Sequence, residues 1–441
     1  MPDSIALHAR SSAIGASLRF ARVPGNIASV ALLLVPEKGA GRMPRDLSRV
    51  QTVVIAMMEN RSFDHILGYL GLPDSGHPLA GRIEGIQHAQ TYYAHDTYQP
   101  RPISSPSLTP DPPHERENID TQINSILGPM HGFAQSYRNA FPNADPARVM
   151  EYCVNAYLPS TDFLARNFAI CDNWFACLPA STLPNRLMAM SGYALVDHTP
   201  SGVFQITSDL FNNNPEDLVY DWLRVHGAAW RVYYSGSFFF MQMPRLLNLY
   251  QGDVQVQNLF RPIDRLIDDF KNDDVPQVVF IEPLYEDDYR RGTAAASDDH
   301  PPASLYGGQR HLKIVYDALV AGDTWDNLVA FITYDEHGSF FDHVRPPAIL
   351  TAPPPNAQYS AGFSTLGVRV PTIVVSPFVQ LGSLCEQLFD HTSILRFLGE
   401  KFNGGKYTDL VDNRAVQSAS VALDDNLLAN GATGAPPSMD D

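Results

Sequence analysis

The segment Thr52 to Leu70, TVVIAMMENRSFDHILGYL, constrains the fold of this chain more than any other. Its first part, Val53 to Met58, is a continuous apolar run that begins with three β-branched residues. Such a run is typical of a strand covered on both faces, as in a parallel sheet. Glu59 and Asn60 follow it directly. Because ligands in open α/β sheets bind beyond the carboxyl ends of strands, the segment predicts either a site or a solvated strand-to-helix turn.

The same pattern of a buried strand followed by polar residues recurs along the chain. Val275 to Ile281 ends at Glu282, and Leu328 to Thr333 runs into Tyr334-Asp335-Glu336-His337-Gly338. A further strand is expected at Val370 to Ser376. Strands that alternate with helices predict a mainly parallel sheet with helices on both faces. Such a sheet brings the strand ends to one rim.

A helix is expected to begin at Ser181-Thr182, because Pro184 and the helix-favouring run Leu187 to Met190 follow. The hydroxyl is either a simple N-cap, which stabilises the helix by about 1 kcal/mol, or a nucleophile. At this position the helix dipole and the free N–H groups favour an incoming phosphate. Arg186 would bind that phosphate in a bidentate manner, which slightly favours the nucleophile.

The strand-end residues offer an oxygen-rich ligand set beside the Thr182 hydroxyl. Glu59, Asn60, Asp335 and Glu336 supply carboxylate and amide oxygens. Oxygen ligands favour hard divalent cations such as Ca²⁺, Mg²⁺ or Mn²⁺, whereas a set dominated by histidine favours Zn²⁺. A cation beside Thr182 would lower the pKa of its hydroxyl and orient it for attack on phosphorus.

Three histidines are candidates for proton transfer or for holding a phosphoryl group, namely His114, His300 and His337. His114 follows Asp111-Pro-Pro on a stiff turn and, taken alone, has the pattern of a surface histidine. The alternative arrangement is a metal-free histidine site. In a metal-free site, the four strand-end ligands would include carboxylates with no evident function beside an anionic substrate.

Composition excludes several classes of protein. With 441 residues the chain is long enough for one large α/β domain with insertions or for two domains. Its net charge of −17 disfavours stable binding to nucleic acid. Its four cysteines lack the spacing of a zinc site and predict buried thiols, with a Cys171–Cys177 pair left open. No stretch is long enough for a transmembrane helix.

Four ordered motifs resemble those of one family. They are ENRSFDH from Glu59, STLPNR from Ser181, Asp299-His300-Pro301, and YDEHG from Tyr334. Together they are similar to the phosphoesterase family that contains nonspecific phospholipases C of bacteria and plants and certain acid phosphatases. The similarity runs from about Val50 to Phe402.

The resemblance implies an alkaline-phosphatase-like, three-layer α/β/α sandwich with inserted loops or a small subdomain. It also implies a phosphothreonine intermediate and one divalent metal ion, with Ca²⁺, Mg²⁺ or Mn²⁺ favoured and Zn²⁺ as the alternative. The residues that it places at the metal are Glu59, Asn60, Asp335, Glu336 and Thr182, and those near the phosphoryl group are His114, Asp299 and His300. Ser339 departs from the family, in which many members have a second glycine. For Asp64 and His65 a structural role is favoured.

Three regions are expected. Residues 1–49 form an N-terminal extension, either frayed or a weak export signal. Residues 50–402 form the catalytic domain, with an inserted region at about 194–274 that leaves the main sheet. Residues 403–441 are polar and end in a disordered tail. The lack of a clear signal peptide favours a cytoplasmic location, whereas the family resemblance favours a secreted or periplasmic one.

The leading functional hypothesis is phospholipase C type cleavage of phospholipids such as phosphatidylcholine, with transient contact to a membrane surface and no protein partner. An acid phosphatase acting on soluble monoesters is the alternative within the same chemistry. A non-catalytic phosphate- or metal-binding protein is the alternative of another class. The apolar cluster 238–243 is either a lipid entrance or part of the core.

Overall fold

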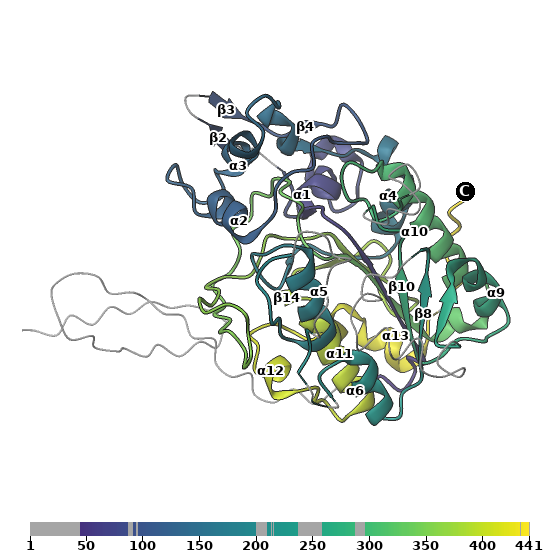
Figure 1. Ribbon diagram of the computed structural model, residues 1–441. Coiled ribbons are helices and arrows are strands. Elements are labelled where there is room, and N and C mark those ends of the chain that lie inside the picture. The colour runs from purple at the N-terminus through teal and green to yellow at the C-terminus, as the bar shows by residue number, and fades with distance from the viewer. Residues whose placement is uncertain are drawn as a thin grey trace, which may run out of the picture. The chain divides into compact units, whose positions relative to one another are not determined.

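The computed structural model describes residues 45–86, 91–93, 96–199, 210–212, 214, 216–236, 258–286, 296–432 and 434–440. These residues build an eight-stranded sheet in the order β13-β6-β12-β11-β1-β10-β8-β9, with helices around it (Figure 1). Most of the expected N-terminal extension, residues 1–44, and the apolar cluster 238–243 lie outside the described residues.

The centre of the sheet is parallel. β1 (Thr52–Met58) lies between β10 (Val278–Glu282) and β11 (Leu328–Tyr334), and both pairings are parallel. β8 (Trp230–Tyr234) pairs with β10, and β9 (Phe260–Pro262) pairs with β8, again in parallel. All seven residues of β11 are buried, as a strand covered on both faces requires.

The other side of the sheet is mixed. β12 (Thr372–Val375) is antiparallel to β11 and to β6 (Ala169–Cys171), while β13 (Leu384–Cys385) pairs with β6 in parallel. The mainly parallel sheet predicted from the sequence is therefore confirmed.

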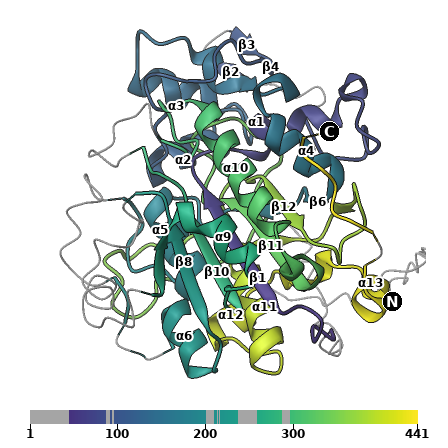
Figure 2. The same ribbon diagram turned by 90° about the vertical axis from the view of Figure 1, so that its right-hand side faces the viewer.

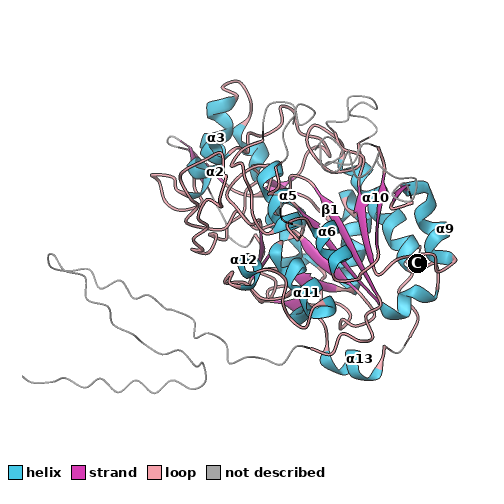
Figure 3. Ribbon diagram, turned by 60° about the horizontal axis from the view of Figure 1, so that its bottom comes forward, coloured by secondary structure: helices cyan, strands magenta, loops and turns pink. Residues whose placement is uncertain are grey.

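Helices cover both faces of the sheet, as Figures 2 and 3 show. One layer contains α4 (Pro159–Asn167), α9 (Leu266–Lys271) and α10 (Leu305–Leu319). The other contains α5 (Thr182–Ser191), α6 (Val219–Val225) and α11 (Thr392–Phe402). The predicted three-layer α/β/α sandwich is confirmed.

Shorter elements complete the molecule. Those beyond the carboxyl end of β1 are α1 (Phe63–Ile66), β2 (Thr91–Tyr93), β3 (Asp96–Tyr98), β4 (Arg101–Pro102), α2 (Arg116–Ile123) and α3 (Phe133–Ala140) (Figures 1 and 2). β5 (Glu151–Tyr152) pairs with β4. The others are β7 (Trp174–Phe175), β14 (Phe389–Asp390), α12 (Asp409–Asp412) and α13 (Asp425–Asn430). None of the described helices is both long enough and apolar enough to span a membrane.

The register of β1 with β11 sets two strand ends side by side. Met58 is the register partner of Tyr334, so Glu59 and Asp335, each the next residue, leave the sheet at the same edge. The Asp335 N–H donates to Met58 O at 3.1 Å, and the Asn60 N–H donates to Asp335 Oδ1 at 3.1 Å. Parallel pairing thus joins residues that lie 275 positions apart in the chain.

The described parts of region 194–274 differ from the expected excursion. They supply β8 and β9 to the main sheet, together with α6 and α9. Trp230 and Tyr233 of β8 are buried, and β8 pairs with β10 along its whole length. The local sequence pattern of an aromatic strand near a sheet edge is the same as that of a strand in a separate hairpin. The sequence therefore did not show that β8 belongs to the main sheet.

The C-terminal tail also differs from the expectation of disorder. Leu428 of α13 is buried in the core. The Tyr316 hydroxyl of α10 donates to Pro437 O at 2.6 Å, and Lys313 Nζ lies 3.0 Å from Asp440 Oδ1. The described residues of the tail therefore pack on the domain. Its polar composition concealed these contacts, because they use a backbone carbonyl and an ion pair.

Candidate active site

The site begins at the N-terminus of α5, as the sequence predicts. Thr182 is the first residue of this helix and is buried, and Arg186 lies one turn further along the same helix face. Asn185 holds the preceding loop: its Oδ1 accepts the Leu178 N–H at 2.9 Å, and its Nδ2 donates to Ala180 O at 2.7 Å. The helix therefore fixes the loop that presents Thr182.

Asn60 links Thr182 to the end of β1. The Thr182 hydroxyl donates to Asn60 Oδ1 at 3.3 Å, and Asn60 Nδ2 lies 3.3 Å from His114 Nε2. Asn60 has a φ of 59°, in the left-handed region that asparagine adopts more readily than most residues. Gly338 is required beside it, because a Cβ at this position would collide with Asn60 O. Three predicted site residues are thus in contact.

Arg186 lies among three buried carboxylates. Its Nη2 is 3.2 Å from Glu59 Oε1, its Nε is 3.6 Å from Asp335 Oδ2, and its Nη1 is 3.7 Å from Glu282 Oε2. Its Nη2 also donates to Met57 O at 3.3 Å. The single guanidinium therefore offsets part of the acidic charge of the three carboxylates at the strand ends. Its expected contact with a phosphate stays a prediction.

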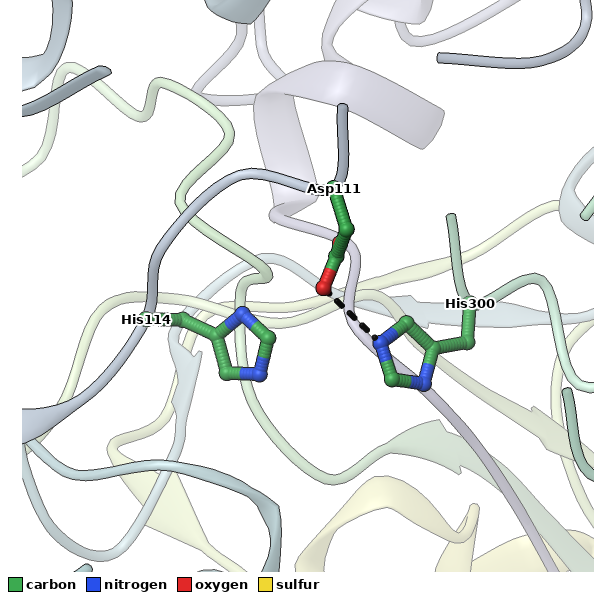
Figure 4. Close-up of side chains that lie close together, drawn as sticks. All are labelled: Asp111, His114 and His300. Carbon is green, nitrogen blue, oxygen red and sulfur yellow. Dashed lines mark hydrogen bonds and ion pairs between the residues drawn. The ribbon is translucent and has the colours of Figure 1, made fainter. Parts of the chain in front are cut away.

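His300 bridges two acids, as Figure 4 shows for one of them. Its Nδ1 lies 3.2 Å from Glu59 Oε2, and its Nε2 lies 3.3 Å from Asp111 Oδ2. The ring of His114 faces it across 5.8 Å between ring centroids. His114 Nδ1 donates to Pro112 O at 2.7 Å, so one proline-stiffened turn delivers both an acid and an imidazole.

The neighbouring acids favour the charged forms of both histidines. Burial opposes the imidazolium of His300, but Asp111 and Glu59 raise its pKa well above the ordinary value. Burial also opposes the imidazolium of His114, but Glu336 and Asp111 raise its pKa above the ordinary value. The site therefore holds two imidazole groups that can carry a proton near neutral pH.

The donor set fits a divalent cation. Burial and the charge of Glu59 raise the pKa of Asp335 to about 8, although the nearby Arg186 lowers it. Glu336 Oε1 is buried and accepts no hydrogen bond from the described residues. Among the described residues, Glu59 Oε1 and Asp335 Oδ2 also accept no hydrogen bond, and each lies near Arg186. Carboxylate oxygens held in this way suit Mg²⁺, Mn²⁺ or Ca²⁺.

Two groups of described residues around His300 also place possible ligand atoms within 4.8 Å of one another. They are Glu59-Asp298-His300 and Asp111-His114-His300. Both include imidazole nitrogen, which Zn²⁺ accepts readily. The first group shares Glu59 with the predicted oxygen set, and the second shares His300 with the first. These overlaps are consistent with a divalent cation at the end of β1.

Asp299 lies against α10. Its Oδ2 accepts the Tyr334 hydroxyl at 2.6 Å, and its backbone O accepts Arg61 Nε–H at 2.8 Å. A Cβ at Gly308 of α10 would overlap its carboxylate. Burial raises the pKa of Asp299 to about 6. Asp299 has a φ of 75°. The preceding residue, Asp298, is the acid that lies beside Glu59 and His300.

His337 and Ser339 connect the turn after β11 to α2. His337 Nε2 lies 2.7 Å from Gln122 Oε1, and its Nδ1 lies 3.2 Å from Glu336 Oε2. Gln122 Nε2 donates to Ser339 Oγ at 2.6 Å. Ser339 has a φ of 61°, which explains why glycine would suit this position. The catalytic role expected for His337 stays a prediction.

A family comparison decides the relationship that these motifs indicate. A model described as the Phosphoesterase family matches residues 50–404, a range that contains the sheet, α5 and all the site residues above. The chain belongs to the Phosphoesterase family. Membership makes it a hydrolase of phosphoric ester bonds, as the sequence predicts.

Curated relatives of this phosphoesterase include plant and bacterial enzymes. Non-specific phospholipase C3 of Arabidopsis thaliana is 30% identical over 394 residues, which cover 81% of this chain and 70% of the relative. Non-hemolytic phospholipase C of Burkholderia pseudomallei is 29% identical over 422 residues, covering 82% and 57%. A solved protein in the alkaline phosphatase superfamily from Vibrio parahaemolyticus aligns over 58% of this chain and 63% of its own, at 9% identity. The TM-score of this alignment is 0.34.

A second charged cluster of the phosphoesterase fixes the turn after β1. Asp64 Oδ1 lies 3.1 Å from Arg369 Nη2, and Asp64 Oδ2 lies 2.7 Å from His343 Nδ1. Arg369 Nε donates to Asp342 Oδ1 at 3.0 Å. His65 is buried, and burial lowers its pKa well below the ordinary value. These contacts support the structural role predicted for Asp64 and His65.

We expect the His343–Asp64 pair to make stability depend on pH. Burial opposes the imidazolium, but Asp64 raises the pKa of His343 to about 9. Because this value exceeds the unfolded value of about 6.5, the stabilisation is complete below about pH 6.5 and is lost as the pH rises through about 9. Urea unfolding of the wild type and of His343→Gln should differ by roughly 2 kcal/mol at pH 6 and converge above about pH 9.5. A difference that does not change with pH would contradict this assignment.

Sequence reasoning missed several residues of the phosphoesterase site. Asp111 and Glu282 belong to motifs in the sequence, but the sequence alone does not assign a role at the site to either. The sequence motif points to Asp299 and not to Asp298. The signal for Asp111 was its place two prolines before His114. The signal for Glu282 was its place at the end of a buried strand. Nothing local in the sequence distinguishes Asp298 from Asp299.

Proposed function

We propose that this phosphoesterase is a metal-dependent hydrolase of the phospholipase C type, which cleaves phospholipids such as phosphatidylcholine through a phosphothreonine intermediate. The observation that carries the proposal is the Thr182 hydroxyl, which lies at a helix N-terminus and donates to Asn60 in the middle of a buried cluster of acids and histidines. The names of the relatives, which are phospholipases C, support the lipid substrate.

The proposed first step is attack by Thr182 Oγ1 on the phosphorus. The bond between phosphorus and the glycerol oxygen breaks, diacylglycerol leaves, and phosphocholine remains esterified to Thr182. Asn60 orients the nucleophile, because its side-chain oxygen accepts a hydrogen bond from the hydroxyl at 3.3 Å. The proton of the hydroxyl passes to solvent water as the bond to phosphorus forms. The N–H groups of the first turn of α5 favour the negative phosphoryl oxygens. A divalent cation, when bound at Glu59, Asn60, Asp335, Glu336 and Thr182, would lower the pKa of the hydroxyl and offset the phosphoryl charge.

Proton delivery is assigned to His300, with His114 facing it. Asp111 and Glu59 raise the pKa of His300 against the effect of burial, so its imidazolium is populated near neutral pH. That form can protonate the departing glycerol oxygen and, as imidazole, can accept a proton from the water that hydrolyses the phosphothreonine. Hydrolysis releases phosphocholine, and the Thr182 oxygen takes a proton back from solvent water, which restores the hydroxyl.

A parallel assay tests the proposed substrate. Phosphatidylcholine in mixed micelles and p-nitrophenyl phosphate are offered to the same preparation, and Thr182→Ala serves as the control for contaminating activity. We expect kcat/KM for phosphatidylcholine to exceed that for the monoester by at least about tenfold, with diacylglycerol as a product. A preference for the monoester would make the enzyme a phosphatase. Inactivity on both would favour a binding protein.

A further inference from the structure

Cys171 and Cys385 lie opposite each other on adjacent strands. They are register partners in the parallel pairing of β6 with β13, at the side of the sheet next to β12 (Figure 2). Neighbouring strands are about 4.8 Å apart, and disulfides join Cα atoms about 4.4–6.8 Å apart. Register partners also project their side chains to the same face of a sheet. The backbone spacing therefore suits a disulfide without rearrangement.

The two thiols differ in access. Cys171 is fully buried, whereas Cys385 is partly exposed at the edge of the sheet. Contact with the Cys385 sulfur raises the pKa of Cys171, and burial adds to this effect, while the same contact lowers the pKa of Cys385. The reachable sulfur is thus the better nucleophile, and the buried sulfur lies in contact with it.

We propose that Cys171 and Cys385 form a reversible disulfide when the folded protein meets a low-molecular-weight disulfide such as oxidised glutathione. Cys385 Sγ attacks one sulfur of the oxidant and releases one glutathione. Cys171 Sγ then attacks Cys385 Sγ and releases the second glutathione. Two protein thiols are oxidised, the oxidant is reduced to two thiols, and the protons of the cysteines leave on the released glutathione.

The other two cysteines provide matched controls. All four are free in this structure, so the Cys171–Cys177 pair left open by the sequence is not formed. Cys153 and Cys177 are buried, and burial raises the pKa of each thiol. Neither Cys153 nor Cys177 is exposed to solvent, and neither has a cysteine as its register partner on a neighbouring strand among those the structure describes. Oxidation should therefore leave both unmodified.

The test is native oxidation of the full chain with excess oxidised glutathione, followed by alkylation, trypsin and mass spectrometry. Cleavage after Arg166, Arg186, Arg369 and Arg396 yields peptides 167–186 and 370–396. We expect these peptides to be joined with the loss of two hydrogen atoms. Because the first contains both Cys171 and Cys177, the joined pair should persist in Cys177→Ser and disappear in Cys171→Ser.

A second readout is thermal unfolding. A disulfide between β6 and β13 closes a long loop and restricts the unfolded chain. Oxidation should raise the Tm of the wild type by about 5 °C and leave that of Cys385→Ser unchanged, since this partly exposed position tolerates serine. A lasting glutathione adduct on Cys385, a link that requires Cys177, or dimers joined through Cys385 would each overturn the proposal.

Discussion

Replacing Thr182 with alanine is expected to lower kcat on phosphatidylcholine by about four decades or more while the protein stays folded. The variant lacks the oxygen that would attack phosphorus, and no other hydroxyl lies at the first position of α5. The structural cost is small, because the described hydrogen bond of the hydroxyl is the 3.3 Å contact with Asn60. Losing such a bond costs about 1 kcal/mol. Steady-state kinetics and thermal unfolding of the same preparation measure the two effects.

Two further variants sharpen this test. Thr182→Ser keeps the nucleophilic oxygen and should retain part of the activity. Ser181→Ala removes the neighbouring hydroxyl, which donates to Glu115 Oε2 at 2.8 Å, and should stay within about tenfold of the wild type. A phosphocholine adduct should be trapped on Thr182 by rapid acid quench. Near wild-type turnover of Thr182→Ala would exclude the covalent route.

Removal of divalent cations is expected to lower turnover by about three decades, and their return should restore it. The physical reason is the density of negative charge at the strand ends. Burial and Glu59 raise the pKa of Asp335 to about 8, so one positive guanidinium does not fully balance the carboxylates around it. A cation would supply the missing charge. Metal analysis of the isolated protein and activity after chelation measure the effect.

Glu336→Gln separates cation binding from folding. This change removes one negative charge where Glu336 Oε1 accepts no hydrogen bond from the described residues. It should weaken cation binding, measured by calorimetry, with little loss of stability. Glu282→Gln is the matched control, because Glu282 faces Arg186 at 3.7 Å and lies outside the predicted ligand set. A fully active metal-free enzyme would refute the cation assignment.

The strand ends were predictable because they follow from two local signals. Continuous apolar runs marked β1 and β11, and parallel pairing then required their polar successors to meet. The position of Thr182 was predictable from the proline that follows it in the first helical turn. In each case a short segment contains the whole signal.

Other features depend on contacts that no short segment records. The carboxylates around Arg186 come from three strand ends, so the sequence could not predict that they surround it. The chemistry of arginine by itself suggested a phosphate ligand. The position of Asp298 beside Glu59 and His300, next to the predicted Asp299, is likewise a property of the folded chain. β6 and β13 are only three and two residues long, so the sequence did not reveal that Cys171 faces Cys385.

The in-register pairing of β1 with β11 has a consequence for how the protein matures. The two halves of the proposed cation site, Glu59-Asn60 and Asp335-Glu336, belong to segments that come together only when the central strands align. An unfolded chain presents no such site, so the free energy of cation binding adds directly to that of folding. If the proposed site binds a cation, the concentration of divalent cations during folding would therefore affect the yield of folded protein.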